Sequence, residues 1–253
     1  MNPLHTEFVR LYHADPQHAL LHDATRSALL GADGHVRCAV LELARPADWS
    51  MLGAVWRAVQ TELELPAPGI AINGQDGYQL WFAWQQGIST ETAHMFLQNL
   101  VQHYLPEVAP QRLRCWPGAS SEATAKEGPF PASVPALHPH SGQWSAFIAP
   151  DLAAVFADEP WLDRDPGVEA QAQLLGRLEG MHQQVFAMAH ALLQRAPTVS
   201  ALVSSPKPAT EAQSTDYPTD SPTAFLQAVM KDPAAPLALR VQAATALMPP
   251  TAS

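Results

Sequence analysis

The chain has 253 residues, which is enough for one or two domains, and 47% of them are hydrophobic, so a core can form and full disorder is excluded. The formal net charge of -10 at pH 7 disfavours a protein whose main task is to neutralise nucleic-acid phosphates, although it leaves room for a local basic groove. No basic start precedes an apolar run at the N-terminus, no segment approaches about 18 continuous apolar residues, and the two cysteines are far apart. We therefore expect a cytoplasmic protein with no membrane span and with two reduced thiols, Cys38 and Cys115.

Helical and strand patterns alternate through the first half of the chain. Gly74-Gln-Asp-Gly77 between two β-rich runs predicts a hairpin, and Ser89 or Thr90 can cap a helix. Trp49 and Trp56 recur at helical spacing and are expected to lie inside. The expected elements are helices at 3–13 and 16–30, a strand at 36–44, a helix at 46–63, strands at 70–73 and 78–84, a helix at 90–104 and a strand at 113–116.

The next segment adds a loop, one more strand and helices. A Pro-, Gly- and Ser-rich loop is expected at 117–136, then a strand at 143–149 and a short helix at 150–157. Apolar residues three or four apart predict one long helix within 166–197. The order of these elements predicts an α+β domain over residues 1–165, with a small mixed sheet and flanking helices, on which the long helix packs.

The composition changes after the long helix. Residues 198–220 are rich in Ser, Thr and Pro and are predicted to be a flexible linker. Residues 221–253 predict a helical hairpin, which is too short for an independent core. We expect it to dock on a protein surface, either in its own chain or in a partner.

Glu42 is the acid within the predicted strand at 36–44. A carboxylate there could hold a metal or act as a base, but it could equally lie at a sheet edge or pair with Arg37 or Arg114. His138 and His140 are two residues apart in a Pro-rich loop, and a metal site would need a third ligand that the sequence does not mark.

Two further patterns have both a functional and a structural interpretation. His18 and His22 would share a helix face, but the acid of a zinc-protease motif is absent between them. Trp81 belongs to an aromatic strand that could stack bases, although both faces of that strand are apolar, which favours a strand buried on both sides. Neither a phosphate-binding Gly-rich loop nor a Gly-x-Ser-x-Gly elbow occurs in the sequence.

The order of several short segments resembles the archaeal and eukaryotic-type primase-polymerase superfamily. The matching segments are Val40-Leu-Glu-Leu43, Gly77-Tyr-Gln-Leu-Trp-Phe82, Arg114-Cys-Trp-Pro-Gly118 and Leu137-His-Pro-His-Ser-Gly142, within residues 36–150. The resemblance implies binding of nucleotides and templates, with primer extension by two metal ions. It marks Gln79, Trp81, Arg114 and His138 as nucleotide-binding candidates.

The chain departs from that family where the chemistry would occur. The paired acids are reduced to Glu42, and Gln79 replaces the histidine that contacts the nucleotide. Two-metal phosphoryl transfer needs several carboxylates, so the resemblance implies a catalytically degenerate relative without a metal cofactor. The alternative is an active nucleotide-handling enzyme that uses Mg²⁺ or Mn²⁺ with Glu42 and a second acid such as Asp76 or Asp151.

The C-terminal segment has a second, shorter resemblance. Residues 224–230 and 239–244 are similar to helical pieces of phage DNA-packaging small subunits. The sequence as a whole therefore favours a non-catalytic interaction protein in DNA- or mobile-element-related assemblies, with a protein partner bound through the hairpin at 221–253.

Overall fold

The computed structural model divides the chain into two compact units, Met1–Ala201 and Leu202–Ser253. The second unit lies outside the described residues, as do the linker at 198–220, the hairpin at 221–253 and most of the expected helix at 16–30. The structure describes residues 2–16, 29–118, 130, 131, 133–139 and 141–195.

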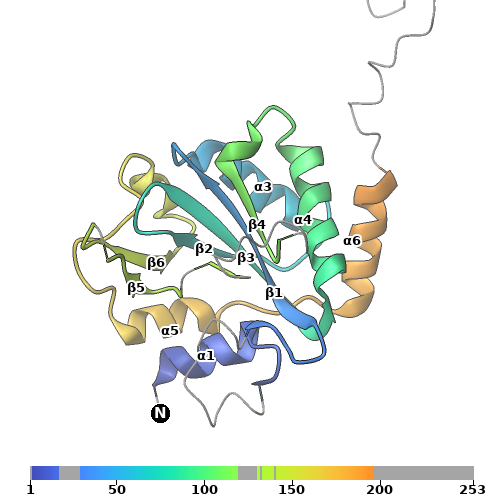
Figure 1. Cartoon of the computed structure of the whole chain (residues 1–253), viewed down its shortest axis with the longest axis horizontal. Helices are drawn as coiled ribbons and strands as arrows, with labels where there is room; N and C mark the ends of the chain where they lie inside the picture. The colour runs from blue at the N-terminus through green and yellow to red at the C-terminus, as the bar shows by residue number, and fades with distance from the viewer. Residues whose placement is uncertain (1, 17–28, 119–129, 132, 140, 196–253) are drawn as a thin grey trace, which may run out of the picture. The chain divides into compact units, whose positions relative to one another are not determined.

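One antiparallel sheet forms the centre of the first unit (Figure 1). Within the described residues its strand order is β4-β1-β3-β2-β6-β5, and all of the paired strands run antiparallel. The α+β class is confirmed, but the expectation of a mixed sheet is wrong, because the described parallel pairing is a single isolated bridge between Trp84 and Met181. The strands are β1 (His35–Ala44), β2 (Gly69–Ile72), β3 (Gly77–Ser89), β4 (Leu113–Trp116), β5 (Ala136–Leu137) and β6 (Trp144–Ile148).

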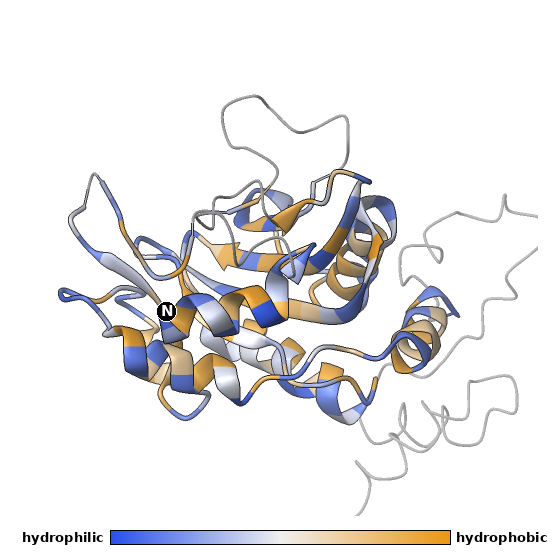
Figure 2. Cartoon of the chain, turned by 90° about the horizontal axis from the view of Figure 1, so that it is seen from below, coloured by the Kyte–Doolittle hydropathy of each residue, from blue (hydrophilic) through white to orange (hydrophobic). Residues whose placement is uncertain are grey.

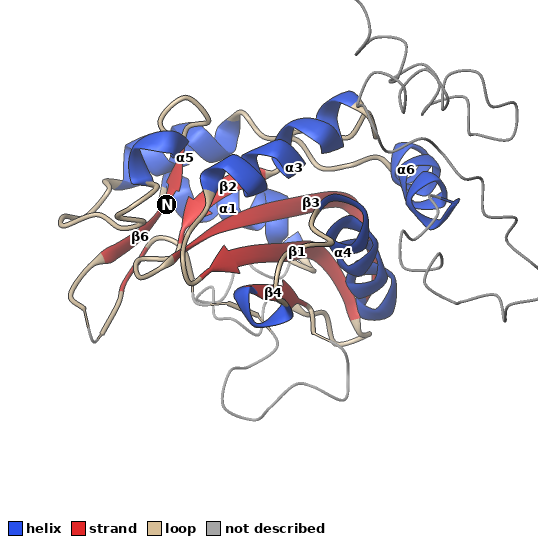
Figure 3. Ribbon diagram, turned by 90° about the horizontal axis from the view of Figure 1, so that it is seen from above, coloured by secondary structure: helices blue, strands red, loops and turns tan. Residues whose placement is uncertain are grey.

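Helices cover both faces of this sheet (Figure 3). Figure 2 shows that they carry polar and apolar residues side by side, as expected of helices that pack with one face. None of the described helices is long and apolar enough to cross a membrane. The helices are α1 (Pro3–Tyr12), α3 (Trp49–Thr61), α4 (Thr90–Tyr104), α5 (Val168–Gly176) and α6 (Gln183–Arg195), with short 3₁₀ turns η2 (Pro110–Arg112) and η3 (Ala153–Phe156).

The succession β1-α3-β2-β3-α4-β4, with the strand order 4-1-3-2, is the split βαβ arrangement of ferredoxin-like folds. Tyr78 and Phe82 lie on one face of β3, where they contact Trp49 of α3 and Phe96 of α4. Trp81 points to the opposite face, where it contacts α1. The two crossover helices therefore share one face, and α1 covers part of the other.

The local signals that define these elements behave as the sequence predicts. The Ser89 hydroxyl accepts a hydrogen bond from the backbone N–H of Thr92 and so caps α4. Gly74 adopts a φ of 81° in the hairpin turn, a conformation that favours glycine. Trp49 and Trp56, expected inside, are only half-buried and pack at the margin of the core.

The expected long helix at 166–197 is instead two helices. The segment between α5 and α6 leaves the helical path so that Met181 can bond to the sheet. The Met181 N–H donates to the Ala83 carbonyl at 2.8 Å, and its carbonyl accepts from Gln85 at 3.0 Å. Within a continuous helix the N–H and carbonyl of Met181 would bond to other residues of that helix. Pairing of Met181 with β3 therefore requires the helix to be interrupted between α5 and α6.

Candidate functional site

Glu42 lies near the end of β1, an interior strand between β4 and β3, and its exposed fraction is only 4%. It is paired in register with Gln79 on β3 and with Arg114 on β4. Directly paired residues of an antiparallel sheet point to the same face. The three side chains therefore form a polar row across the face that α1 partly covers, opposite the crossover helices.

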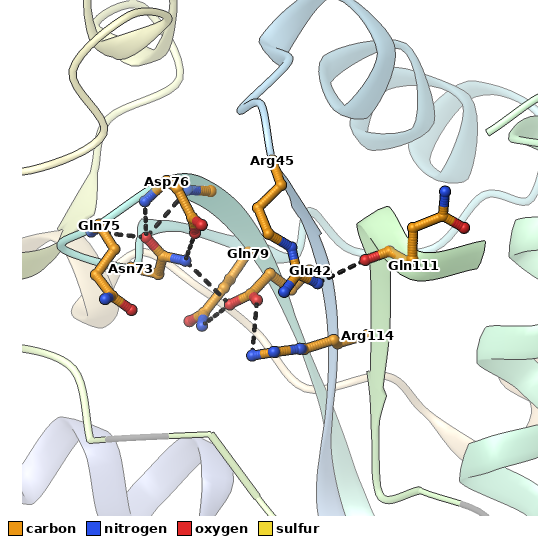
Figure 4. A network of polar contacts seen from close by, with 9 residues as sticks. Glu42, Arg45, Asn73, Gln75, Asp76, Gln79, Gln111 and Arg114 are labelled. Carbon is orange, nitrogen blue, oxygen red and sulfur yellow. Dashed lines mark hydrogen bonds and ion pairs between the residues drawn. The ribbon is translucent and has the colours of Figure 1, made fainter. Parts of the chain in front are cut away.

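Three donors surround the Glu42 carboxylate (Figure 4). The Gln79 amide donates to Oε2 at 2.7 Å, and the Asn73 amide donates to the same oxygen at 3.4 Å. The Arg114 guanidinium forms an ion pair with Oε1, with 3.9 Å between Nη1 and the oxygen. The carboxylate is thus compensated by groups of the protein itself.

The orientation of the Gln79 amide follows from its second partner. The indole N–H of Trp81 donates to the Gln79 Oε1 at 2.9 Å. Because an indole N–H can only donate, Gln79 must present its oxygen to Trp81 and its NH₂ group to Glu42. The oxygen and the nitrogen of this amide therefore both form hydrogen bonds with neighbouring side chains on the same face of the sheet.

Asn73 joins the hairpin turn to the same network. Its side-chain oxygen accepts from the backbone N–H groups of Gln75, Asp76 and Gly77, which closes the turn. Its side-chain NH₂ donates to Asp76 at 3.2 Å as well as to Glu42. The two acids that the sequence marked therefore share one amide nitrogen as a partner.

Burial dominates the electrostatics of Glu42. Removal from water raises the pKa of its carboxyl, and the bonds from Gln79, Arg114 and Asn73 offset only part of that effect. The Asp76 charge adds to the rise in pKa. A carboxyl whose pKa is raised by burial is useful in acid–base chemistry but is equally found in structural networks.

The donor set around Glu42 does not fit a divalent cation. Mg²⁺ and Mn²⁺ prefer several oxygen ligands, whereas amide NH₂ groups and a guanidinium point at this carboxylate. In the described part of the chain, no group of three or more His, Cys, Asp and Glu residues could hold a metal ion.

The other sequence candidates on the sheet differ in exposure. Trp81 is 1% exposed and its ring contacts Phe8, Tyr12 and Phe147, so the nucleotide-stacking hypothesis for it is corrected: its ring is part of the core. The strand buried on both sides is confirmed. The Arg114 side chain is 38% exposed, which makes it the solvent-facing member of the polar row.

The histidine candidates and Asp151 belong to other parts of the chain. The His138 ring lies 3.2 Å from the Ser141 hydroxyl within its own loop. His140, His18 and His22 lie outside the described residues. Asp151 lines a separate pocket beside β6.

Sequence reasoning missed Asn73 as a member of the site. The available signal was its place directly before Gly74, because Asn in that position commonly bonds to the backbone of its own turn. No local signal connects such a turn to an acid 31 residues earlier in the chain.

No family model matches the sequence, and no curated protein matches it.

Proposed function

We propose that this chain is a non-catalytic binding protein of the cytoplasm, built on a degenerate primase-polymerase-like core and working in DNA- or mobile-element-related assemblies. The observation that carries the proposal is the state of Glu42. This acid stands where the resembled family places its metal-binding pair, yet it is 4% exposed and is held by Gln79 and Asn73.

The arrangement of elements supports the proposed core. The resembled family has an acid-bearing strand, then a helix, a hairpin and a further strand, and the chain folds in this order as β1, α3, β2-β3 and β4. Glu42, Gln79 and Arg114, which come from three separate matching segments, lie in one row. Three distant segments that meet at one place are better evidence than any of them alone.

The same contacts argue against turnover. Nucleotidyl transfer requires metal ions to meet the charge that develops on the phosphoryl group, and those ions require clustered carboxylates. Arg114 supplies a positive charge beside Glu42 in place of a metal. Gln79 lacks the positive charge of the histidine that it replaces, and its NH₂ group already donates to Glu42 while its oxygen accepts from Trp81, so at most one N–H remains for a triphosphate.

Binding can still use the exposed part of the row. The Arg114 side chain is 38% exposed, and a guanidinium is well suited to a nucleotide or polynucleotide phosphate. We propose that Arg114 binds a phosphate group without catalysing a reaction. We also propose, from the sequence alone, that a protein partner binds the segment 221–253.

A binding titration tests this proposal. Labelled single-stranded DNA, a primer–template and a nucleotide analogue would be titrated with the full chain, and fluorescence anisotropy would report saturation. We expect saturable binding of at least one of these probes, weakened about three- to tenfold by Arg114→Gln, since one charged phosphate contact is lost. Arg57→Gln is the matched control, because Arg57 is an exposed arginine on α3, away from the row. Equal loss in both variants would contradict a specific contact at Arg114.

One observation favours an enzyme as the second candidate. Glu42 and Asp76 accept from the same Asn73 nitrogen, so two carboxylates converge beside Arg114. An active nucleotide-handling enzyme would need Mn²⁺ or Mg²⁺ to bind at this place. A rise in the melting temperature with Mn²⁺ that Asp76→Asn abolishes would favour this candidate, since a ligand bound only to the native state stabilises it.

A further inference from the structure

A pocket unrelated to the Glu42 row opens beside β2 and β6. Its volume is about 270 Å³, and Trp56 of α3, Ile70 of β2, Phe147 of β6 and Leu174 of α5 contribute apolar walls. This volume lies just below the usual range of small-molecule pockets, roughly 300–1,000 Å³, so it suits a molecule with one or two rings and not a nucleoside triphosphate.

A hydrogen bond fixes one wall of the pocket, and a glycine forms part of another. The Trp56 indole N–H donates to the Pro68 carbonyl at 3.0 Å, which holds the indole ring at the pocket. Gly69 also lines the pocket. A Cβ at Gly69 would lie 2.7 Å from the Tyr12 hydroxyl and 3.1 Å from Leu178, so this position has no room for a side chain, and glycine lets Tyr12 and Leu178 pack directly against the backbone.

The Tyr12 hydroxyl, which lies against Gly69, is unpaired in the described structure. Tyr12 is fully buried, and its hydroxyl has no hydrogen-bond partner in the described structure. Beside it lies a cavity of about 10 Å³, which shares Gly69, Pro68 and Leu178 with the larger pocket. This cavity is about the size of one water molecule or one polar ligand atom. Leaving a buried hydroxyl without a partner is unfavourable, so a group that bonds to it is favoured.

Two opposite charges line the larger pocket. Asp151 follows β6 and Arg177 follows α5, and both side chains are exposed. Neither side chain has a hydrogen bond or ion pair within the described residues. The pocket therefore combines apolar walls, an anion and a cation, and an unpaired hydroxyl at the adjoining cavity.

We propose that this pocket binds a small zwitterion with an aromatic body, of the chemical class of the aromatic α-amino acids. The aromatic ring packs among Trp56, Ile70 and Phe147. The ammonium group pairs with Asp151 and the carboxylate with Arg177. A ring N–H, or a water molecule bound to the ring, reaches the Tyr12 hydroxyl. The pocket uses none of the residues of the Glu42 row, so this ligand is independent of the proposed function.

Calorimetric titration of the full chain with a matched set of probes tests the proposal. L-tryptophan carries both charges, indole-3-acetate only the anion, tryptamine only the cation and indole neither. We expect L-tryptophan to bind most tightly, and the two singly charged probes about tenfold more weakly, because each lacks one charged contact. Equal affinity for indole and L-tryptophan, or no saturable binding of L-tryptophan at millimolar concentration, would overturn the proposal.

Variants assign the charges separately. Arg177→Gln should lower the affinity for L-tryptophan and indole-3-acetate about tenfold and leave the affinity for tryptamine unchanged. Asp151→Asn should lower the affinity for L-tryptophan and tryptamine and leave the affinity for indole-3-acetate unchanged. Arg57→Gln and Asp163→Asn, which remove exposed charges outside the pocket, are the controls. An equal loss of affinity for all probes in every variant would contradict the assignment.

A filling variant tests the pocket itself. Ala149 is half-buried and lines the pocket, so Ala149→Phe should occupy it without removing a core side chain. We expect this variant to keep the melting temperature of the wild type and to lose L-tryptophan binding. A folded Ala149→Phe protein that binds L-tryptophan as the wild type does would place the ligand elsewhere and overturn the proposal.

Discussion

The amide of Gln79 donates a 2.7 Å hydrogen bond to the buried carboxylate of Glu42, across the paired strands β1 and β3. The contact joins two residues 37 positions apart, both of which the sequence marked as candidates for nucleotide chemistry. In the folded chain they are partners of each other. The two functions proposed above, a non-catalytic site and an active one, predict different chemistry for this pair, and its burial makes a separate prediction for stability.

Replacing Glu42 by its isosteric amide should leave the protein as stable as the wild type or more stable at pH 8. Burial raises the pKa of Glu42, so the ionised form is less favourable in the folded chain than in the unfolded chain. Its contribution to stability is therefore fully present below the usual glutamate pKa of about 4.3 and is lost as the pH rises through the raised, folded-state value. Glu42→Gln does not titrate and should exceed the wild type by roughly 1 kcal/mol at pH 8.

Urea unfolding at pH 4.5 and pH 8 measures this difference, which should grow with pH. Glu42→Ala is the companion variant. It removes the acceptor of Gln79 and Asn73 and should lower the free energy of unfolding by about 1–3 kcal/mol at pH 8. A loss above about 2 kcal/mol in Glu42→Gln would mean that the ion pair with Arg114 outweighs the cost of burial.

Gln171 should be essential for attaching α5 to the sheet. Its side-chain oxygen accepts from the Phe147 N–H at 2.7 Å, and its NH₂ donates to the Phe147 carbonyl at 2.9 Å. Gln171→Leu leaves both buried backbone groups of β6 unpaired and should cost about 2–4 kcal/mol in chemical denaturation. Gln173→Leu, at an exposed position of the same helix, should change stability by less than about 0.5 kcal/mol. Similar losses in both variants would assign the effect to the helix and not to these two bonds.

Trp56 should contribute both packing and one hydrogen bond. Trp56→Phe removes the bond to the Pro68 carbonyl and should cost about 1 kcal/mol in thermal or urea unfolding. Trp56→Ala and Trp49→Ala should each cost about 2–3 kcal/mol, less than the 3–5 kcal/mol typical of a buried tryptophan, because both residues are half-buried. Losses near zero would show that α3 is held by its fully buried residues Leu52, Val55 and Val59 alone.

The elements that the sequence predicted well have local causes. The hairpin follows from the glycines at 74 and 77, and α4 begins where Ser89 offers a cap. Gln79 and Trp81 are two residues apart, so alternation along a strand puts them on one face of β3, where their side chains bond to each other. Periodicity and turn chemistry are properties of neighbouring residues, so a single sequence contains them.

The features that the sequence did not predict depend on distant parts of the chain. The apolar spacing of residues 168–195 continues through the break between α5 and α6, which exists because Met181 bonds to β3. The burial of Trp81 depends on α1, whose Phe8 and Tyr12 cover its ring. The direction of strand pairing, and the meeting of Asn73 with Glu42, likewise arise only when separate elements pack.

Primer extension decides whether Glu42 is catalytic. Purified full chain would be incubated with a primer–template, labelled nucleotides and Mn²⁺ or Mg²⁺, beside Glu42→Gln as the control that preserves shape. We predict no extended product from either protein, because the Glu42 carboxylate is buried and compensated by Gln79, Asn73 and Arg114 and cannot join a two-metal site. Extended product from the wild type that is absent with Glu42→Gln would contradict this prediction and make Glu42 a catalytic residue.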